Sequence, residues 1–414
     1  MLALLEQGQE CRGQQEGQSV ASEAAAEAQA QAGVPSRYNI RLGGGGINLS
    51  AGAQGIYVDN VYLTHENARD DFILAPEVNA GAFFPIGQLN TLSVNLGLEY
   101  YHYFKNSDLN SSTPTINPNS DLEFHIYTGD FRITLSEVFS YQELPFFETG
   151  GQFFNVYDTG RFARFDNRAG ASATWDLHDL VVDAGYHHED LLSNGSAFNF
   201  IDRHSEIFNA DAFLSVMPRA SVGMEAAGSW NQFDNVRYND HWRAGLGPAL
   251  KLKLTDYINV KVGAGYQRVQ YDSDLDSQYG LGGFNTFYAY VNLDQTINKF
   301  FSHSLVVSHD NEVGINAANL EGTHVTYALT WNATQALRVA PYLGYTHYTE
   351  SYNSGVPSLY HETFDYVSGG IGAAYTLTQN WRLGLSYDYR LKDSDIVAYG
   401  FSQDRVTLEA TYQF

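Results

Sequence analysis

The sequence of 414 residues predicts an all-β protein, a single antiparallel up-and-down transmembrane β-barrel of about eighteen strands. Three observations lead to this fold class. Apolar and polar residues alternate along most of the chain, very short turns alternate with long polar loops, and the composition suits strands. Successive side chains of a strand point to opposite faces, so a period of two indicates a sheet with two different surfaces.

The composition favours strands and turns over helices. Aromatic residues make up 14% of the chain, with 29 Tyr and 25 Phe, and there are 38 Gly but only 3 Met. No run of 18 apolar residues occurs, which excludes an ordinary transmembrane helix. A transmembrane barrel remains compatible with the mean hydropathy of −0.29, because alternation dilutes the hydropathy of every segment.

The charge and the cysteine count exclude several functions. The formal net charge is −24, so nucleic acid is not expected as a partner, since phosphate binding needs a basic face. Cys11 is the one cysteine, which excludes an intramolecular disulfide and a cysteine-based metal cluster. We expect neither a cofactor nor a metal site.

Residues 1–37 are expected to be separate from the barrel, which would occupy 38–414. The stretch Ser22–Gly33 is rich in Ala, Glu and Gln, and we expect it to be disordered or a short helix. The first residues have no basic region and no apolar stretch, so no signal peptide is visible. For an exported chain we therefore expect a different start.

Pairs of alternating segments joined by a short turn recur from about residue 38 onward. Trp242–Leu254 and Ile258–Gln267 flank Thr255–Tyr257, and in the first of them Arg243, Lys251 and Lys253 share the polar face. Similar turns are expected at Pro85–Gln88, Thr128–Asp130, Leu177–Asp179, Met217–Arg219, Asn298–Phe301, Thr334–Leu337 and Thr378–Asn380. Longer polar segments are expected as loops at His65–Asp71, Lys105–Asp121, Glu189–Asn199, Asp272–Gly283 and Asn353–Ser358.

This asymmetry indicates a bacterial outer-membrane barrel with short periplasmic turns and long extracellular loops, whereas sandwiches follow no such rule. The first strand is expected near Ile47–Tyr62 and the last at Val406–Phe414. An even strand count places both termini in the periplasm. The count becomes sixteen if Leu122–Tyr141 is one strand rather than two.

The apolar face should contact lipid and the polar face should line the lumen, because charged side chains are costly in a dry core. Closing the sheet leaves no strand edge and satisfies the backbone groups within lipid. Aromatic residues near strand ends are expected to form interfacial girdles. They are Tyr100, Tyr101, Tyr103, Trp175, Tyr345 and Tyr348.

The C-terminal VTLEATYQF is expected to be the closing strand, paired with the first. It also resembles the C-terminal sorting signal of outer-membrane barrels. The residues that carry this resemblance are Val406, Leu408, Ala410, Tyr412 and Phe414. The resemblance implies recognition by the barrel-assembly machinery. We also expect contact with outer-membrane lipid and lipopolysaccharide.

The first strands carry two short motifs, Asp59-Asn60-Val61-Tyr62 after a glycine-rich strand and Asp71-Phe72-Ile73-Leu74-Ala75-Pro76. With the aromatic-rich strand that follows, this segment resembles the β-barrel porins associated with exopolysaccharide operons. The resemblance implies export of a polysaccharide across the outer membrane. Composition and periodicity by themselves indicate only a porin-like barrel.

Alternation places nine basic residues on inward faces, and these are the candidate lumen or selectivity residues. They are Arg132, Arg164, Arg168, Arg243, Lys251, Lys253, Lys261, Arg382 and Arg390. They can pair with inward acids (Asp166, Asp183, Glu225 and Asp388), or Arg243, Lys251, Lys253 and Lys261 can form a basic track for anionic solutes or an acidic polysaccharide. Tyr101, Tyr288 and Tyr290 are candidate stacking surfaces for sugars.

No motif predicts catalysis, and we expect a channel rather than an enzyme. The alternatives are a barrel hydrolase with a rim site at His187, and a non-conducting structural or adhesion barrel. His187 and Glu189 share one strand face, but two local ligands do not make a zinc site. His303 and His309 are too far apart for a local pair, and Asp272–Ser277 resembles a calcium loop without its final Glu.

Overall fold

The computed structural model describes residues 38–143, 163–195, 198–235, 240–272, 283–312, 319–351 and 362–414. The expected N-terminal segment with Cys11 lies outside these residues, as does most of the calcium-like segment at Asp272–Ser277. No helix among the described residues is long and apolar enough to span a membrane.

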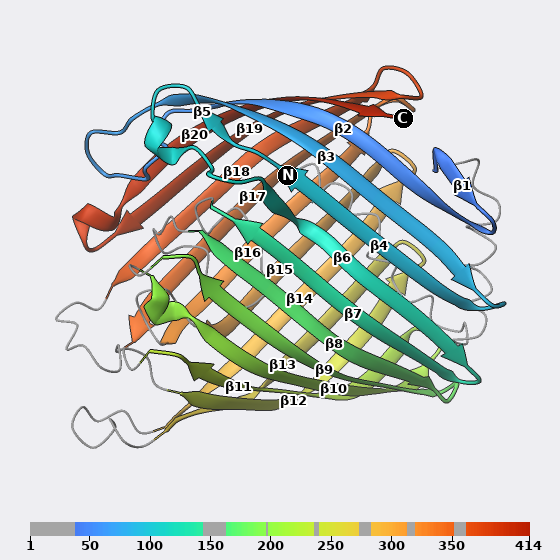
Figure 1. Cartoon of the computed structure of the whole chain (residues 1–414). Coiled ribbons are helices and arrows are strands. Elements are labelled where there is room, and N and C mark those ends of the chain that lie inside the picture. The colour runs from blue at the N-terminus through green and yellow to red at the C-terminus, as the bar shows by residue number, and fades with distance from the viewer. Residues whose placement is uncertain are drawn as a thin grey trace.

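Eighteen long antiparallel strands form one closed barrel (Figure 1). They are β2 (Gly45–Val58), β3 (Asp71–Ile86), β4 (Asn90–Glu99), β6 (Thr115–Thr128), β7 (Phe131–Gln142), β8 (Arg164–Asp176), β9 (Leu180–Ser193), β10 (Arg203–Met217), β11 (Ala220–Phe233), β12 (His241–Thr255), β13 (Ile258–Tyr271), β14 (Phe284–Asn298), β15 (Phe301–Glu312), β16 (Asn319–Asn332), β17 (Leu337–Ser351), β18 (Thr363–Thr376), β19 (Trp381–Ser394) and β20 (Phe401–Gln413).

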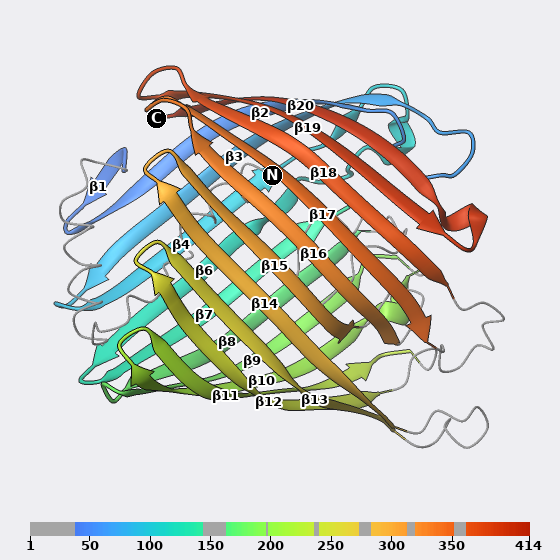
Figure 2. The same ribbon diagram turned by 180° about the vertical axis from the view of Figure 1, so that it is seen from behind.

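Two short strands extend the wall. β1 (Ile40–Leu42) pairs with β2, and β5 (His102–Tyr103) pairs with β3. The helical turns η1 (Ser107–Leu109), η3 (Asn199–Ile201) and η4 (Val397–Tyr399) lie in loops. The strands cross the barrel wall obliquely on both sides of the molecule (Figure 2).

The last strand closes the barrel, as the sequence predicted. β20 pairs with β19 on one side and with β2 on the other, where Tyr57 faces Val406 and Ser50 faces Gln413. The Phe414 amide donates to the Leu49 carbonyl at 3.1 Å. Because the closing pair is antiparallel, the start of β2 and the end of β20 lie at the same end of the barrel.

Turn lengths confirm the predicted asymmetry. Eight connections of two to four residues join the strands at one end, and each lies at one of the predicted short turns. The connections at the other end are six residues or longer. The segment Leu122–Tyr141 contains two strands, β6 and β7, so the count is eighteen rather than sixteen. The first long strand ends at Val58 and not at Tyr62, because the Asn60 side chain closes a turn with Thr64.

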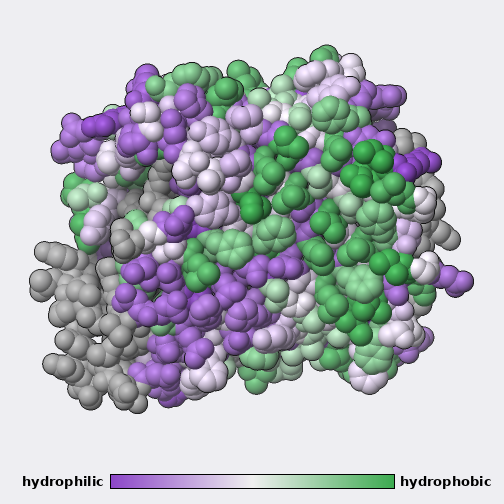
Figure 3. All heavy atoms as spheres, viewed as in Figure 1, coloured by the Kyte–Doolittle hydropathy of each residue, from purple (hydrophilic) through white to green (hydrophobic). Residues whose placement is uncertain are grey.

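On the side of the barrel shown in Figure 3, the outer surface is apolar near the short-turn end and polar near the loop end. Outward aromatic pairs pack together at the short-turn end: Phe131 stacks on Trp175 at 5.2 Å, and Trp381 packs against Tyr412 in a tilted arrangement at 5.1 Å between ring centroids. Such pairs form an interfacial girdle. The closed barrel and its apolar outer band confirm the predicted fold and the outer-membrane location.

The girdle assignment was correct for only part of the predicted set. Trp175 and Tyr345 are exposed on the outer surface, and Tyr100 is half-buried. Tyr101, Tyr103 and Tyr348 are buried, at 6%, 4% and 0% exposure, and they pack inside the loop end of the barrel. Proximity to a strand end therefore does not separate a girdle residue from one that packs under a loop.

Candidate functional site: the lumen and its mouth

The candidate site is the interior of the barrel, which is lined by polar side chains. A barrel of 16–18 strands leaves an aqueous channel rather than a packed core. The strand register places all nine predicted basic residues on this inner face. The neighbouring positions along the same strands point outward, as the exposed fractions of Trp242 (38%) and Leu385 (51%) show. Their placement agrees with alternation, but their surroundings differ.

On the β9–β13 wall, acidic and basic residues stand side by side. Asp183, Asp211 and Glu225 are direct cross-strand neighbours on β9, β10 and β11. Lys251 and Lys261 are direct neighbours on β12 and β13. Like charges placed opposite each other repel, so each row needs the other for compensation.

Contacts between the two rows supply this compensation. Lys261 Nζ lies 2.5 Å from a Glu225 carboxylate oxygen, and the Tyr290 hydroxyl donates to the other oxygen at 2.5 Å. Lys251 Nζ lies 3.7 Å from the centroid of the buried Phe213 ring, a cation–π contact. The lysines of the predicted basic track are therefore held against their own wall.

The other members of that track lie at the two ends of the barrel. Arg243 is near the start of β12, where its Nη1 donates to the Asn311 carbonyl at 2.5 Å. Lys253 lies near the β12–β13 turn, 3.8 Å from Asp256. Eight residues of strand separate Arg243 from Lys251, about 26 Å at 3.3 Å per residue. The four residues form two separate groups rather than one continuous track.

Two arginines near the loop end are buried within ion pairs. Arg164 is fully buried and contacts Asp166 at 3.2 Å, so a passing solute cannot reach it. Arg203, which the sequence analysis did not single out, is 2% exposed and contacts Glu189 at 3.0 Å. Arg168 lies opposite Glu189 in the β8–β9 register. These groups stabilise the wall beneath the loops.

A second basic region lies on β17–β20 and is more accessible. Arg382 is exposed, and Arg390 donates to the Gln403 side-chain carbonyl at 3.3 Å. Two further arginines, Arg338 on β17 and Arg405 on β20, face the lumen beside them. Arg405 donates to the Thr407 hydroxyl at 3.3 Å, and Asp388 opposite it accepts from the Tyr342 hydroxyl at 2.9 Å. We call these four arginines the β17–β20 arginine wall; Arg338 and Arg382 lie toward its short-turn end, and Arg390 and Arg405 lie toward its loop end.

Acidic residues dominate the neighbouring β2–β6 wall. Glu77, Glu99 and Glu123 face the lumen from β3, β4 and β6. Gln54 donates to Glu77 at 3.3 Å, and Tyr101 donates to Glu99 at 2.5 Å. The β2–β6 sector of the lumen is therefore mainly acidic and the β17–β20 sector carries arginines, whereas acidic and basic residues are mixed on β9–β13.

Two of the three tyrosines predicted as stacking surfaces lie flat on the wall. A Cβ added to Gly265 would come within 2.4 Å of the Tyr288 ring, and one added to Gly263 within 2.5 Å of the Tyr290 ring. Glycine is required at both positions because the rings cover them directly. Tyr101, the third candidate, is buried under a loop instead.

Three loops pack inward and narrow the loop end of the lumen. We call 59–70, 100–114 and 194–202 the mouth loops; residues 196 and 197 of the last are outside the described part of the chain. Tyr103 and Leu109 pack on the inner faces of β2 and β3. Leu63 packs on Tyr348, Phe364 and Phe401 across the barrel closure, and Phe200 and Ile201 pack on β9 and β13.

The motifs that carry the family resemblance anchor these loops. Asp59 accepts from the Asp404 amide at 2.8 Å, and Asn60 donates to the Ser402 carbonyl at 2.9 Å. The fully buried Asp71 carboxylate accepts hydrogen bonds from the backbone amides of residues 104–106. The motifs therefore have an architectural role, in which they hold the mouth loops against the strands.

The sequence contained a signal for the mouth loops that alternation analysis missed. Near the loops the strict period of two is replaced by continuous apolar runs, as in Phe72-Ile73-Leu74-Ala75. A strand that is apolar on both faces is covered on both faces. At these positions lipid covers the outer face and a mouth loop covers the inner face.

The residues proposed for a hydrolase do not form a common site. His187 and Glu189 share the lumen face of β9 as predicted, but Glu189 is bound to Arg203. His303 and His309 face outward, where His303 contacts Gln295 at 2.8 Å and His309 stacks on Phe287 at 4.5 Å. The two pairs are thus on opposite faces of the barrel wall.

An eighteen-stranded closed barrel with an apolar exterior and a charged interior has the architecture of an outer-membrane porin. Among solved structures, a BenF-like porin from Pseudomonas fluorescens Pf-5 is similar to this chain, with a TM-score of 0.50 and 9% sequence identity over 89% of this chain and 99% of that one.

OpdK of Pseudomonas aeruginosa with vanillate gives 0.48 and 10% identity over 89% of this chain and 99% of that one. OccK2 of the same organism with glucuronate gives 0.49 and 10% over 89% and 98%. No protein-family model matches the chain, and no curated protein matches its sequence. The match to the BenF-like porin shows that the chain shares the porin barrel fold.

Proposed function

We propose that this protein is a passive outer-membrane channel for small polar solutes, and that anionic groups pass along the β17–β20 arginine wall. The observation that carries the proposal is the sorting of charge within a closed, polar lumen. Selectivity in such pores comes from the width and the charged lining of the lumen. No covalent step is required, because the barrel only provides a route across the membrane.

The β17–β20 wall is favoured over the β12–β13 lysines for a specific reason. Lys261 is already neutralised by Glu225, and Lys251 is fixed over Phe213. Arg390 and Arg405 donate to neutral groups, the Gln403 amide and the Thr407 hydroxyl. Four guanidinium groups from three strands face the lumen on this wall, and the Arg382 side chain is exposed, so an anion can reach it.

Charge reversal on the two walls tests this assignment. We expect Arg382→Glu with Arg390→Glu to shift the reversal potential in a salt gradient toward cation selectivity. The matched double variant Lys251→Glu with Lys261→Glu should change it less, since these lysines already lie beside Asp211 and Glu225. The measurement is planar-bilayer recording of the refolded protein. A larger shift for the lysine pair would contradict the assignment to β17–β20.

A polysaccharide is the second candidate for the transported solute. It follows from the resemblance to exopolysaccharide-operon porins, and the flat Tyr288 and Tyr290 rings support it because aromatic faces can stack on sugar rings. Added oligosaccharides should then block ion current reversibly, and Tyr288→Ala should weaken the block. If the block is equal in both proteins, these rings are not a sugar-binding surface.

A further inference from the structure

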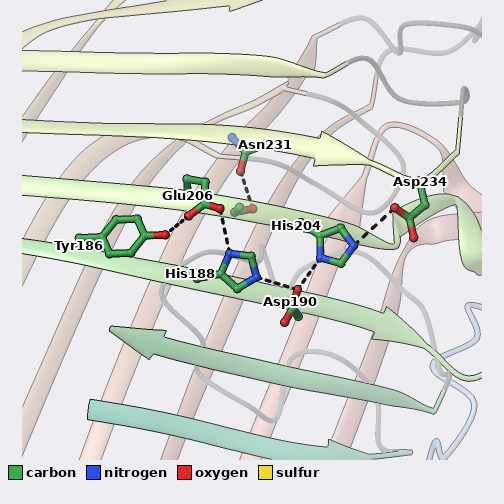
Figure 4. A network of polar contacts seen from close by, with 8 residues as sticks. Tyr186, His188, Asp190, His204, Glu206, Asn231 and Asp234 are labelled. Atoms are coloured by element: carbon green, nitrogen blue, oxygen red, sulfur yellow. Dashed lines mark hydrogen bonds and ion pairs between the residues drawn. The ribbon is translucent and has the colours of Figure 1, made fainter. Parts of the chain in front are cut away.

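A compact group of histidines and carboxylates lies on the outer face of β9 and β10 (Figure 4). His188 and Asp190 are two residues apart on β9, so they point to the same face. His204 on β10 is the direct cross-strand neighbour of Asp190. Their outward direction follows from Tyr186 and Phe208, which are on the same faces of the two strands and are 42% and 54% exposed.

The two imidazole rings converge on the carboxylate of Asp190. Asp190 Oδ1 lies 3.1 Å from His188 Nε2 and within hydrogen-bond contact of His204 Nδ1. One ligand atom from each residue lies within 4.8 Å of the other two. Donor atoms of a tetrahedral zinc site are about 3.3 Å apart, since each bond is about 2.0 Å long. Small side-chain rotations therefore suffice to bring all three onto one ion.

The opposite ring nitrogens face two further carboxylates. His188 Nδ1 lies 3.0 Å from Glu206, which also accepts from the Tyr186 hydroxyl at 2.5 Å. His204 Nε2 lies 3.7 Å from Asp234. Metal-bound histidines usually donate their second ring N–H to a carboxylate or carbonyl, which fixes the ring and raises its basicity. Both histidines here have that arrangement.

We propose that His188, Asp190 and His204 form a binding site for a divalent transition-metal ion, with zinc as the ion to test. Two imidazole nitrogens and one carboxylate oxygen are a common zinc ligand set, with a fourth position left for water. The set is poorly suited to Ca²⁺ or Mg²⁺, which prefer oxygen ligands. Glu206 and Asp234 orient the histidines and add negative charge that attracts the cation.

The site lies on the extracellular side of the barrel surface. The Tyr186 ring packs against Phe208, with 5.1 Å between ring centroids, and His188 and Glu206 follow each of them toward the loop end. His204 is the second residue of β10, and Asp190 lies three residues before the end of β9, so the site is near the loop end of the wall. The open ligand position therefore faces the polar layer outside the hydrocarbon core, where ions from the medium reach it.

The chain provides a matched control on β17 and β18. His347 Nδ1 lies 2.8 Å from Asp365, which accepts from the Tyr345 hydroxyl at 2.7 Å. This group repeats the tyrosine–carboxylate–histidine contacts of the site, but among the described residues no second histidine contacts that carboxylate. It should not bind zinc as a chelate.

The experiment is zinc titration of the untagged, full-length protein refolded in detergent after chelator treatment. We expect wild type and His347→Ala to bind the same number of zinc ions per chain. His204→Ala and Asp190→Asn should each bind one zinc ion fewer. Glu206→Gln should retain this site with 10–100-fold weaker affinity. Co²⁺ substitution should give the visible spectrum of a four-coordinate site in wild type. His204→Ala and Asp190→Asn should not give this spectrum.

Heat-modifiable migration on gels checks that each variant is folded, and two independent ligand variants protect against one folding failure. Equal zinc stoichiometry in wild type, His204→Ala and Asp190→Asn would overturn the proposal, as would loss of the ion in His347→Ala alone. The cluster would then be a hydrogen-bonded network of the barrel surface.

Discussion

Replacing Asp71 by alanine should release the mouth loop 100–114 from the barrel wall. The Asp71 carboxylate is fully buried and accepts from the Phe104 and Lys105 amides at 3.0 Å and from the Asn106 amide at 2.8 Å. The Asn106 side chain adds a fourth hydrogen bond at 2.9 Å. No other described side chain holds this part of the loop with so many contacts.

The size of the effect follows from these bonds. A hydrogen bond to a charged group contributes about 1.5–3 kcal/mol, and the lower end applies where water can reach the released donors. Three backbone bonds at this lower end then give roughly 4.5 kcal/mol of lost loop stability, which is more than a thousandfold increase in the open population at about 1.4 kcal/mol per tenfold. Apolar packing of Tyr103 and Leu109 remains and limits the opening.

Single-channel recording and limited proteolysis measure this change. Asp71→Ala should raise conductance or open-channel noise and should speed cleavage within 100–114. Asp70→Ala is the matched control, because Asp70 makes an exposed ion pair with Lys105 and such pairs contribute about 0–1 kcal/mol. If Asp71→Ala conducts and resists protease as wild type does, Asp71 is not the anchor of the loop.

Three further changes test other parts of the structure. Lys392→Met should lower the free energy of unfolding by about 3–5 kcal/mol in urea, because it leaves the buried Glu362 charge without its partner at 2.8 Å, and the double variant with Glu362→Gln should recover part of the loss. Phe414→Ala should reduce the folded fraction in cell outer membranes but leave refolding in detergent unchanged; equal loss in both would assign Phe414 to stability alone. Gly265→Ala should displace the Tyr288 ring and alter conductance, and an unchanged current would show that the ring does not border the conducting path.

The fold was accessible from the sequence because a transmembrane barrel repeats one local rule many times. Each strand must present an apolar face to lipid, and alternation in segments such as Trp242–Leu254 records this directly. Turn lengths add an independent signal, so the strand pairing and the closure between β20 and β2 followed. The even strand count also predicted that the first strand begins and the last strand ends at the short-turn end of the barrel.

The lumen was only partly accessible. Alternation identifies which side chains face inward, but it does not show which of them are neighbours across strands. Lys261 and Glu225 are 36 positions apart in sequence and meet only because of the β11–β13 register. The same limit applies to His204, whose contact with Asp190 depends on the β9–β10 pairing.

The mouth loops were the least accessible feature. Loops that pack inward break the rule that one strand face is polar, and residues such as Tyr103 and Tyr348 then resemble interfacial aromatics in sequence. Alternation places the apolar residues Ile56 and Ile73 on the inner face, where a water-filled lumen would expose them to water. Attention to such conflicts would have predicted where loops cover the wall.

Planar-bilayer conductance of the refolded, full-length protein tests the central claim most directly. An open polar lumen predicts steady current steps that scale with salt concentration, and the arginine wall predicts a reversal potential on the anion side in a salt gradient. A folded, heat-modifiable barrel that passes no current at any voltage would contradict the channel function and leave a structural role for the barrel.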